Sequence, residues 1–405
     1  MTATVRRVEL KEIATSRSGV AFPTRLQGRR NGKYPFAKVG DISKLARSGT
    51  STLTSAVNYV DDEDLSEVGG QPFPAGTIAF AKIGEAIRQN FRVIIGMPCL
   101  LDNNVIGVIP DETKVDGRYL YHFFRSIDLY SLAQSTAVPS IRKSDLDRLQ
   151  VPLPASIDEQ QRIAGLLDRA DALRSARRTC LALLDELISS IFVDLFGDPV
   201  LNPKSWPRIP LGEVLDAIDS GKSPVCLDRP AGDGEWGVLK LSAVAGGEYF
   251  PEQNKALPEG ASPAIEHEVR PGDLLLTRKN TYELVGACAL VTETPARRLM
   301  PDLLFRLQTR PDSRCTKVYL FGLLTNRSKR NQIQALASGA AASMPNISKA
   351  RLLDLPVEVP PLDLQIEYEH RLMAARKMKA LCRQSMSGLD ETFKALQARA
   401  FRGEL

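Results

Sequence analysis

The feature that most constrains this chain is a stretch of 40 residues, 157–196, in which apolar side chains recur at alternating steps of three and four. This spacing averages 3.5 residues and favours a helix that packs along a partner helix. Ser156 and Glu159 can satisfy the free N–H groups of its first turn, and Gly197 and Pro199 end it. Such a helix is roughly 60 Å long. We expect its packing positions to be Ile163, Leu166, Ala170, Leu173, Leu184, Leu187 and Ile191.

A second long helix is expected at the end of the chain, because the order of motifs repeats after about 200 residues. Residues 10–13 resemble 211–214, and residues 139–143 resemble 345–349. A period this long indicates a duplicated domain plus helix and not a solenoid of short repeats. The packing positions of the second helix are predicted to be Leu364, Tyr368, Ala375, Met378, Leu389 and Leu396.

These observations predict an α+β chain with two similar, mainly-β domains. The first domain occupies residues 1–155 and is followed by a helix at 156–197. A linker and the second domain occupy 198–360, and the second helix occupies 361–405. Because neither helix can bury its apolar stripe on so small a domain, we expect them to pair as an antiparallel coiled coil with pseudo-two-fold symmetry. The two domains would then lie at opposite ends of the paired helices.

Within the first domain, the sequence predicts strands at 34–39, 77–83, 91–95 and 105–109. A helix is predicted at 119–132, where large apolar residues share one face. An acidic run at 61–64 is interpreted as a solvated loop.

Composition excludes several classes of protein. With 405 residues, 43% apolar and 25% charged, the chain is typical of soluble proteins, and no apolar run is long enough to cross a bilayer. We therefore expect a cytoplasmic protein. The net charge is only +5, but residues 1–50 hold eleven Lys and Arg against three Asp and Glu. A basic segment on a nearly neutral chain suits a polyanionic partner.

Residues for catalysis or metal binding are sparse. The chain has three histidines, and it lacks a Walker loop, a G-x-G-x-x-G turn and a G-x-S-x-G elbow. Its six cysteines include no short-spaced pair, and we interpret Cys180 and Cys382 as buried reduced thiols of the long helices. No catalytic residue and no metal ligand are predicted.

Binding residues are better represented, because similar polar groups occur at matched places in both halves. Arg, Lys, Asn and Gln are the side chains that reach base edges and phosphates. The groups that follow strands or flank the repeated Pro-x-Ile turn are Lys82, Arg88, Gln89, Asn90, Arg92, Arg142, Lys143, Arg278, Lys279, Asn280, Asn346 and Lys349. Two similar domains on a helical spacer predict a bipartite DNA site with two different half-sites.

One further group of residues carries a family resemblance. The segment 152–163, with Glu159-Gln160-Gln161-Arg162-Ile163 as its most specific part, and the segment 195–207 are similar to motifs of the specificity subunits of type I restriction-modification enzymes. The second helix departs from the motif, because it keeps only Gln365 of the Glu-Gln pair. The resemblance spans essentially the whole chain.

The resemblance implies a non-catalytic subunit with two target-recognition domains that bind double-stranded DNA. Its helices would dock two methyltransferase (modification) subunits, which would carry S-adenosylmethionine and methylate adenine, while a separate restriction and translocation subunit cleaves DNA. No cofactor and no membrane contact are implied for this chain itself.

Three alternatives remain open at this point. The chain could be the specificity subunit of a type IIB-like enzyme, in which one partner both cuts and methylates. It could be a structural coiled-coil adaptor without DNA binding, which predicts no salt-dependent DNA affinity. A self-sufficient nuclease or methyltransferase is disfavoured, since no catalytic motif is visible.

Overall fold

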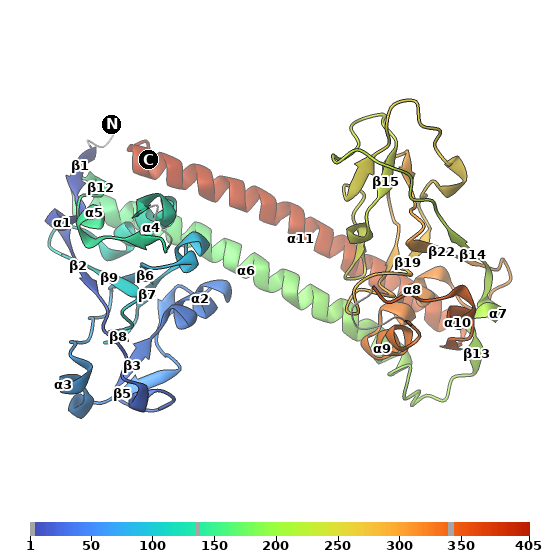
Figure 1. Cartoon of the computed structure of the whole chain (residues 1–405), viewed down its shortest axis with the longest axis horizontal. Coiled ribbons are helices and arrows are strands. Elements are labelled where there is room, and N and C mark those ends of the chain that lie inside the picture. Colours follow the sequence, from blue (N-terminus) through green and yellow to red (C-terminus); the bar gives the residue numbers. More distant parts are fainter. Residues whose placement is uncertain (1–4, 135–137, 339–343) are drawn as a thin grey trace. The chain divides into compact units, whose positions relative to one another are not determined.

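The computed structural model describes residues 5–134, 138–338 and 344–405, so the first four residues of the expected first domain lie outside it. The chain divides into two compact units, Met1–Cys180 with Cys382–Leu405, and Leu181–Leu381. Each unit therefore contains one of the expected domains together with a part of both long helices, α6 (Ile157–Phe196) and α11 (Leu362–Arg402) (Figure 1).

The first unit is built on a five-stranded sheet of order β2-β9-β6-β7-β4 and a three-stranded sheet of order β5-β3-β8. The first and last strands of this domain in sequence, β1 and β12, form an antiparallel pair, as do β10 and β11. Its strands are β1 (Val5–Glu9), β2 (Ala14–Ser18), β3 (Tyr34–Ala37), β4 (Thr52–Leu53), β5 (Asn58–Val60), β6 (Ile78–Ala81), β7 (Arg92–Ile95), β8 (Leu100–Leu101), β9 (Val105–Pro110), β10 (Ala133–Gln134), β11 (Ser140–Ile141) and β12 (Gln150–Pro154). Its helices before α6 are α1 (Leu10–Ile13), α2 (Val39–Arg47), α3 (Leu65–Val68), α4 (Gly117–Ser126) and α5 (Lys143–Asp147).

The second unit repeats this plan with a four-stranded sheet of order β14-β22-β19-β20 and a three-stranded sheet of order β18-β15-β21. The strand pairs β13–β23 and β16–β17 complete it. Its strands are β13 (Arg208–Pro210), β14 (Leu215–Ser220), β15 (Gly237–Leu239), β16 (Val244–Ala245), β17 (Glu248–Tyr249), β18 (Asn254–Ala256), β19 (Leu274–Thr277), β20 (Cys288–Leu290), β21 (Arg298–Leu299), β22 (Leu304–Thr309) and β23 (Pro356–Glu358). Its helices before α11 are α7 (Leu211–Val214), α8 (Lys317–Thr325), α9 (Arg327–Ala335) and α10 (Lys349–Leu353). The α+β prediction with two similar domains is confirmed.

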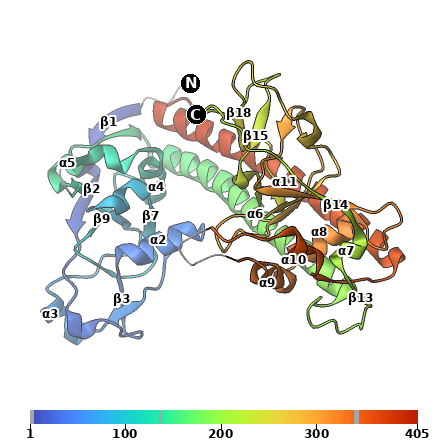
Figure 2. The same ribbon diagram turned by 45° about the vertical axis from the view of Figure 1, so that its right-hand side comes forward.

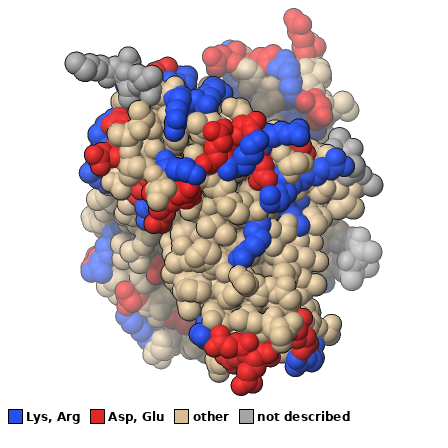
Figure 3. Space-filling model, turned by 90° about the vertical axis from the view of Figure 1, so that its left-hand side faces the viewer, with Lys and Arg blue, Asp and Glu red and all other residues tan. Residues whose placement is uncertain are grey.

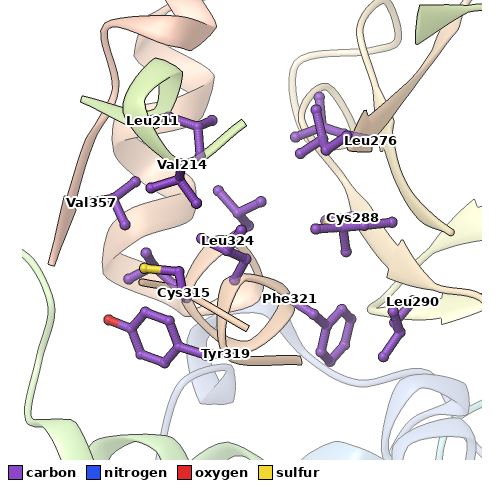
Figure 4. Close-up of a cluster of buried hydrophobic side chains, with 14 of the residues drawn as sticks. Leu211, Val214, Leu276, Cys288, Leu290, Cys315, Tyr319, Phe321, Leu324 and Val357 are labelled. Carbon is purple, nitrogen blue, oxygen red and sulfur yellow. The ribbon is translucent and has the colours of Figure 1, made fainter. Parts of the chain in front are cut away.

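An inner strand of the largest sheet in each unit, β6 or β19, is buried on both faces. In β6, Ile78 and Phe80 face the core formed with α4, while Ala79 faces a second core on the other side of the sheet. Successive side chains of a strand point to opposite faces, so a fully apolar strand requires cover on both. The strand β19 repeats this arrangement. In Figure 4, Phe321 and Leu324 of α8 face side chains of the sheet in the second unit's largest core.

Three predicted elements of the first domain end earlier than expected. The strand expected at 77–83 is β6, which stops at Ala81. The strand expected at 34–39 stops at Ala37, because the Asp41 carboxylate accepts the Lys38 N–H at 2.8 Å and starts α2. The helix expected at 119–132 stops at Ser126, and a separate short helical turn begins where the Asp128 carboxylate accepts the N–H of Tyr130 at 2.9 Å.

The long helices run antiparallel within each unit, and they lie side by side in both views (Figures 1 and 2). In the first unit, Arg174 of α6 contacts Asp390 of α11, and Cys180 contacts Cys382. In the second unit, Asp185 contacts Lys379, and the rings of Phe192 and Tyr368 lie 5.6 Å apart. As the residue number in α6 increases, the residue number of the contacting side chain in α11 decreases, as expected for antiparallel helices.

The face that each helix buries is shifted from the predicted one at several positions. The predictions for Leu173, Leu187 and Met378 are wrong, because these side chains are 59%, 47% and 54% exposed. The less exposed face of each helix follows heptad steps and includes polar residues. The sequence prediction considered only apolar residues and therefore missed them. The members of this face are Gln160, Ile163, Leu167, Ala170, Arg174, Arg177, Leu181, Leu184, Ile188 and Ile191 in α6, and Gln365, Tyr368, Leu372, Ala375, Lys379, Cys382, Met386, Leu389, Phe393, Leu396 and Ala400 in α11. Leu166 and Leu364 are half-buried neighbours of this face.

Candidate nucleic-acid interface

A basic residue at the end of β6 is held by backbone hydrogen bonds on both sides in the first unit. The N–H of Lys82 donates to the carbonyl of Asn104 at 2.9 Å, and its carbonyl accepts the N–H of Ile141 at 2.9 Å. The next residue, Ile83, forms a backbone bridge with Ser140 of the Pro-x-Ile turn. The end of β6 (Lys82 and Ile83) and the turn at Ser140 and Ile141 are separated in sequence but joined by these backbone bonds. We call this arrangement the frame.

The second unit contains the same frame. The N–H of Arg278 donates to the carbonyl of Leu303 at 3.0 Å, and its carbonyl accepts the N–H of Ile347 at 2.8 Å. Lys279 forms the corresponding backbone bridge with Asn346. The structure thus brings together the two kinds of predicted binding residue in each unit.

Around the frame of the second unit lies a cavity of about 390 Å³. The Nε of Arg278 donates to Oδ1 of Asn346 at 3.2 Å, and the guanidinium lies 5.2 Å from the ring centroid of Phe305. The lining residues are Arg278, Lys279, Asp302, Leu303, Met344 and Asn346. Asp302, Leu303 and Met344 were not predicted from the sequence. Aligning the residues just before β22 with those before β9 would have drawn attention to the first two.

Lys82, the counterpart of Arg278, is also held by a side-chain hydrogen bond. Its Nζ donates to the Ser18 hydroxyl at 2.9 Å, and its side chain is half-buried. Neighbouring Asn104 donates through its amide to Asp102 at 2.9 Å. The frame of the first unit therefore presents an ammonium group and amides, whereas that of the second unit presents a guanidinium and a carboxylate.

Three predicted contact residues have structural roles, so the interpretation of their side chains as DNA contacts is corrected. Arg92 is only 7% exposed and donates to the carbonyl of Ile127 at 2.8 Å, and burial lowers its pKa to about 10. Asn90 adopts a left-handed conformation, and its amide bonds to Ile127 and to the N–H of Leu129. Asn280 is buried, and its side-chain oxygen accepts the N–H of Thr281.

The other predicted residues are exposed but engaged with neighbours. Arg88 lies over the Tyr130 ring at 3.7 Å, and Gln89 accepts from Arg47 at 2.9 Å. Lys143 pairs with Asp147 at 2.8 Å within α5. Lys349 donates to the carbonyl of Ile218 at 2.6 Å, and Arg142 is the N-cap residue directly before α5.

The acidic run at 61–64 is not a freely solvated loop. Arg29 contacts Asp64 at 2.7 Å, and Lys33 contacts Asp62 at 2.6 Å, which lowers the pKa of that carboxyl. Part of the basic surplus near the N-terminus is therefore neutralised locally. The face drawn in Figure 3 accordingly carries basic and acidic side chains close together, with an uncharged area between groups of charges.

Within the part of the chain that the structure describes, no cluster of three or more His, Cys, Asp or Glu could hold a metal ion. Among those residues, no helix has both the length and the apolar character needed to cross a membrane.

Comparison with known proteins supports the predicted resemblance. Residues 3–179 match the family model of the type I restriction modification DNA specificity domain, and the similar curated proteins are specificity subunits of type I restriction enzymes. The predicted resemblance is thereby confirmed.

The individual relatives differ in how much of the chain they match. The EcoKI specificity subunit of Escherichia coli is 23% identical over 92% of this chain and 90% of its own. The EcoEI specificity subunit of Escherichia coli is 33% identical over 166 residues, which are 41% of this chain and 28% of that one. The crystal structure of the type I S subunit from M. genitalium has the same fold, with a TM-score of 0.62, 13% identity and coverage of 98% of this chain and 96% of that one.

Proposed function

We propose that this chain is the non-catalytic subunit that selects the DNA sequence in a type I restriction-modification complex. The observation that carries this proposal is the repeated frame, which holds Lys82 and Arg278 at matched strand ends. A basic side chain on a fixed backbone can donate to phosphates and to base edges in double-stranded DNA. The resemblance to type I specificity subunits supports the same reading.

The DNA site would be bipartite. Each unit carries one frame, and the side chains around the two frames differ, so the two half-sites would differ in sequence. The helices α6 and α11, whose halves pair within each unit, would set the spacing of the half-sites, as dimer geometry sets it in symmetric regulators.

The methyltransferase partners would dock on the paired helices. Leu183 and Leu187 of α6 and Met378 and Leu381 of α11 are 47–58% exposed, all within the second unit. Leu187 and Met378 occupy the heptad position just before a seam residue, and this position lies on the same side of both helices in an antiparallel pair. We call these four residues the helix patch. An exposed apolar patch is typical of a protein–protein contact.

S-adenosylmethionine would be bound by those partners and not by this chain. A separate restriction subunit would join the same complex. These assignments rest on the family resemblance and on the helix patch.

A footprint of the complex of this chain with its methyltransferase tests the proposal. We expect two protected DNA segments separated by an unprotected gap, with an affinity that falls steeply as salt rises. Lys279→Ala should weaken binding to all sequences alike and lower the salt slope by about one. Lys394→Ala, which removes an exposed lysine of α11, is the control. A single ungapped footprint, or binding that salt leaves unchanged, would contradict the proposal.

A further inference from the structure

The two frames place different chemistry at matched backbone positions. The carbonyls of Asn104 and Leu303 accept equivalent hydrogen bonds, so the residues before them, Asn103 and Asp302, also correspond. The matched pairs, first unit before second, are Lys82 and Arg278, Ile83 and Lys279, Asn103 and Asp302, Asn104 and Leu303, and Ser140 and Asn346. Only the second unit combines a guanidinium with a carboxylate at these positions.

Neighbouring groups orient both of these charged side chains. Arg278 is oriented by the bond from its Nε to Asn346, and that bond does not use the two terminal nitrogens of the guanidinium. The Ser223 hydroxyl donates to the carboxylate of Asp302, and the Asp302 N–H donates back to the same hydroxyl oxygen at 3.2 Å. Arg278 and Asp302 both line the 390 Å³ cavity. The cavity therefore holds an oriented donor and an oriented acceptor.

A G·C base pair matches this combination on its major-groove edge. Guanine offers two acceptors, O6 and N7, which a guanidinium can contact together, and cytosine offers an amino donor that a carboxylate accepts. An A·T pair lacks the pair of acceptors on one base that suits arginine. We propose that Arg278 and Asp302 select one G·C base pair in the half-site bound by the second unit. This inference rests on the proposed function.

The first unit carries a different set of groups at its matched positions. Lys82 is bonded to Ser18, and Asn103 offers an amide where the second unit has a carboxylate. The half-site of the first unit is thus read by different chemistry from the same frame.

Selection from a library of double-stranded DNA with a randomised site tests the proposal. The complex of this chain with its methyltransferase is used, with wild type, Arg278→Gln and Asp302→Asn compared. In both variants we expect the preference for G·C to fall about tenfold at one and the same position of one half-site. The other half-site should keep its preference. Arg270→Gln, which changes an exposed arginine four residues before β19, should leave every position unchanged.

One more variant of Arg278 distinguishes a loss of base recognition from a loss of positive charge or of folding. Arg278→Lys keeps the positive charge but loses the fork of donors, so affinity should be largely kept while the G·C preference falls. The proposal is overturned if the variants keep the wild-type preference, or if they weaken binding equally for all sequences. If wild type itself selects no sequence, the proposed function and this assignment fail together. If wild type selects a site and the variants keep its preferences, only this assignment fails.

Discussion

At the scale of single residues, one buried glutamine in each unit explains the motif that opens the long helices. The Oε1 of Gln160 accepts the N–H of Asp116 at 2.8 Å, and its Nε2 donates to the carbonyl of Pro154 at 3.2 Å. Gln365 does the same with the N–H of Thr316, at 2.8 Å, and with a carbonyl of the preceding Pro-Pro segment. The fold requires this amide at both sites, whereas the adjacent glutamate of the motif is present only in the first helix.

Replacing the buried glutamine should destabilise the first unit. Gln160→Leu leaves a buried N–H and a buried carbonyl without partners, which costs on the order of 2–4 kcal/mol. Gln161→Leu makes the same change one residue later, where the side chain is exposed, and should cost less than about 0.5 kcal/mol. Urea unfolding of both variants measures the difference. Equal midpoints would contradict the structural role of Gln160.

At the scale of elements, the seam between the long helices is polar at its middle. Arg174 contacts Asp171 and Asp390 and lies 4.4 Å from the Phe393 ring. Arg177 donates to Cys382 at 3.3 Å. A polar seam position fixes the register of paired helices at some cost in stability. The pairing of α6 and α11 is thus specified by charge as well as by apolar contact.

The same seam predicts a specific oxidative cross-link. The sulfurs of Cys180 and Cys382, both in the first unit, lie 3.4 Å apart, although the residues are 202 positions apart in sequence. The hydrogen bond from Arg177 lowers the pKa of the Cys382 thiol, which favours its reactive thiolate. We expect hydrogen peroxide to join the two cysteines, with loss of one hydrogen atom from each thiol and release of water. A faster band on a non-reducing gel and the linked peptides in mass spectrometry detect the product.

Selectivity is the control for this experiment. Burial raises the pKa of Cys99 and of Cys288 to about 12, so these thiols should remain unmodified. Cys180→Ser should abolish the fast band. A cross-link that forms only between two chains, or with another cysteine, would show that the helices do not pair in this register.

At the scale of the whole molecule, the proposed function combines DNA reading with the docking of partner subunits. In α6, exposed apolar side chains at the positions just before seam residues form a second stripe beside the seam. That stripe includes Leu173 and Leu187, which the apolar pattern alone had assigned to the seam. Its exposure favours a role in assembly over a role in the fold.

A charge placed in the helix patch should impair assembly and spare folding. Leu187→Asp is expected to weaken binding of the methyltransferase by about tenfold or more, because a carboxylate would be buried without a partner in the contact. Thermal unfolding of the chain alone should hardly change, since Leu187 is 47% exposed. Val193→Asp, at a similarly exposed valine on another face of α6, is the matched control. Equal loss of binding in both variants would exclude the helix patch as the docking surface.

The sequence by itself determined the duplication, the two long helices and the class of fold. These features are local or repetitive: heptad spacing, capping residues and strand patterns act over a few residues and recur after about 200. Ile163, Ala170, Tyr368 and Ala375 were placed correctly for this reason. Leu173 was not, because Arg174 occupies the seam next to it. A periodic pattern of apolar residues contains no information on charged residues that pair inside a seam.

Only the tertiary structure decided which polar residues surround each frame. Arg92 and Lys279 are alike in sequence, each basic and close to a strand, yet one is buried under Ile127 and the other is exposed beside a cavity. Asp302 joins Arg278 because β22 lies beside β19 in the sheet. Such neighbours come from strands far apart in the chain. Their proximity depends on how the sheets pair and pack, which no short-range pattern specifies.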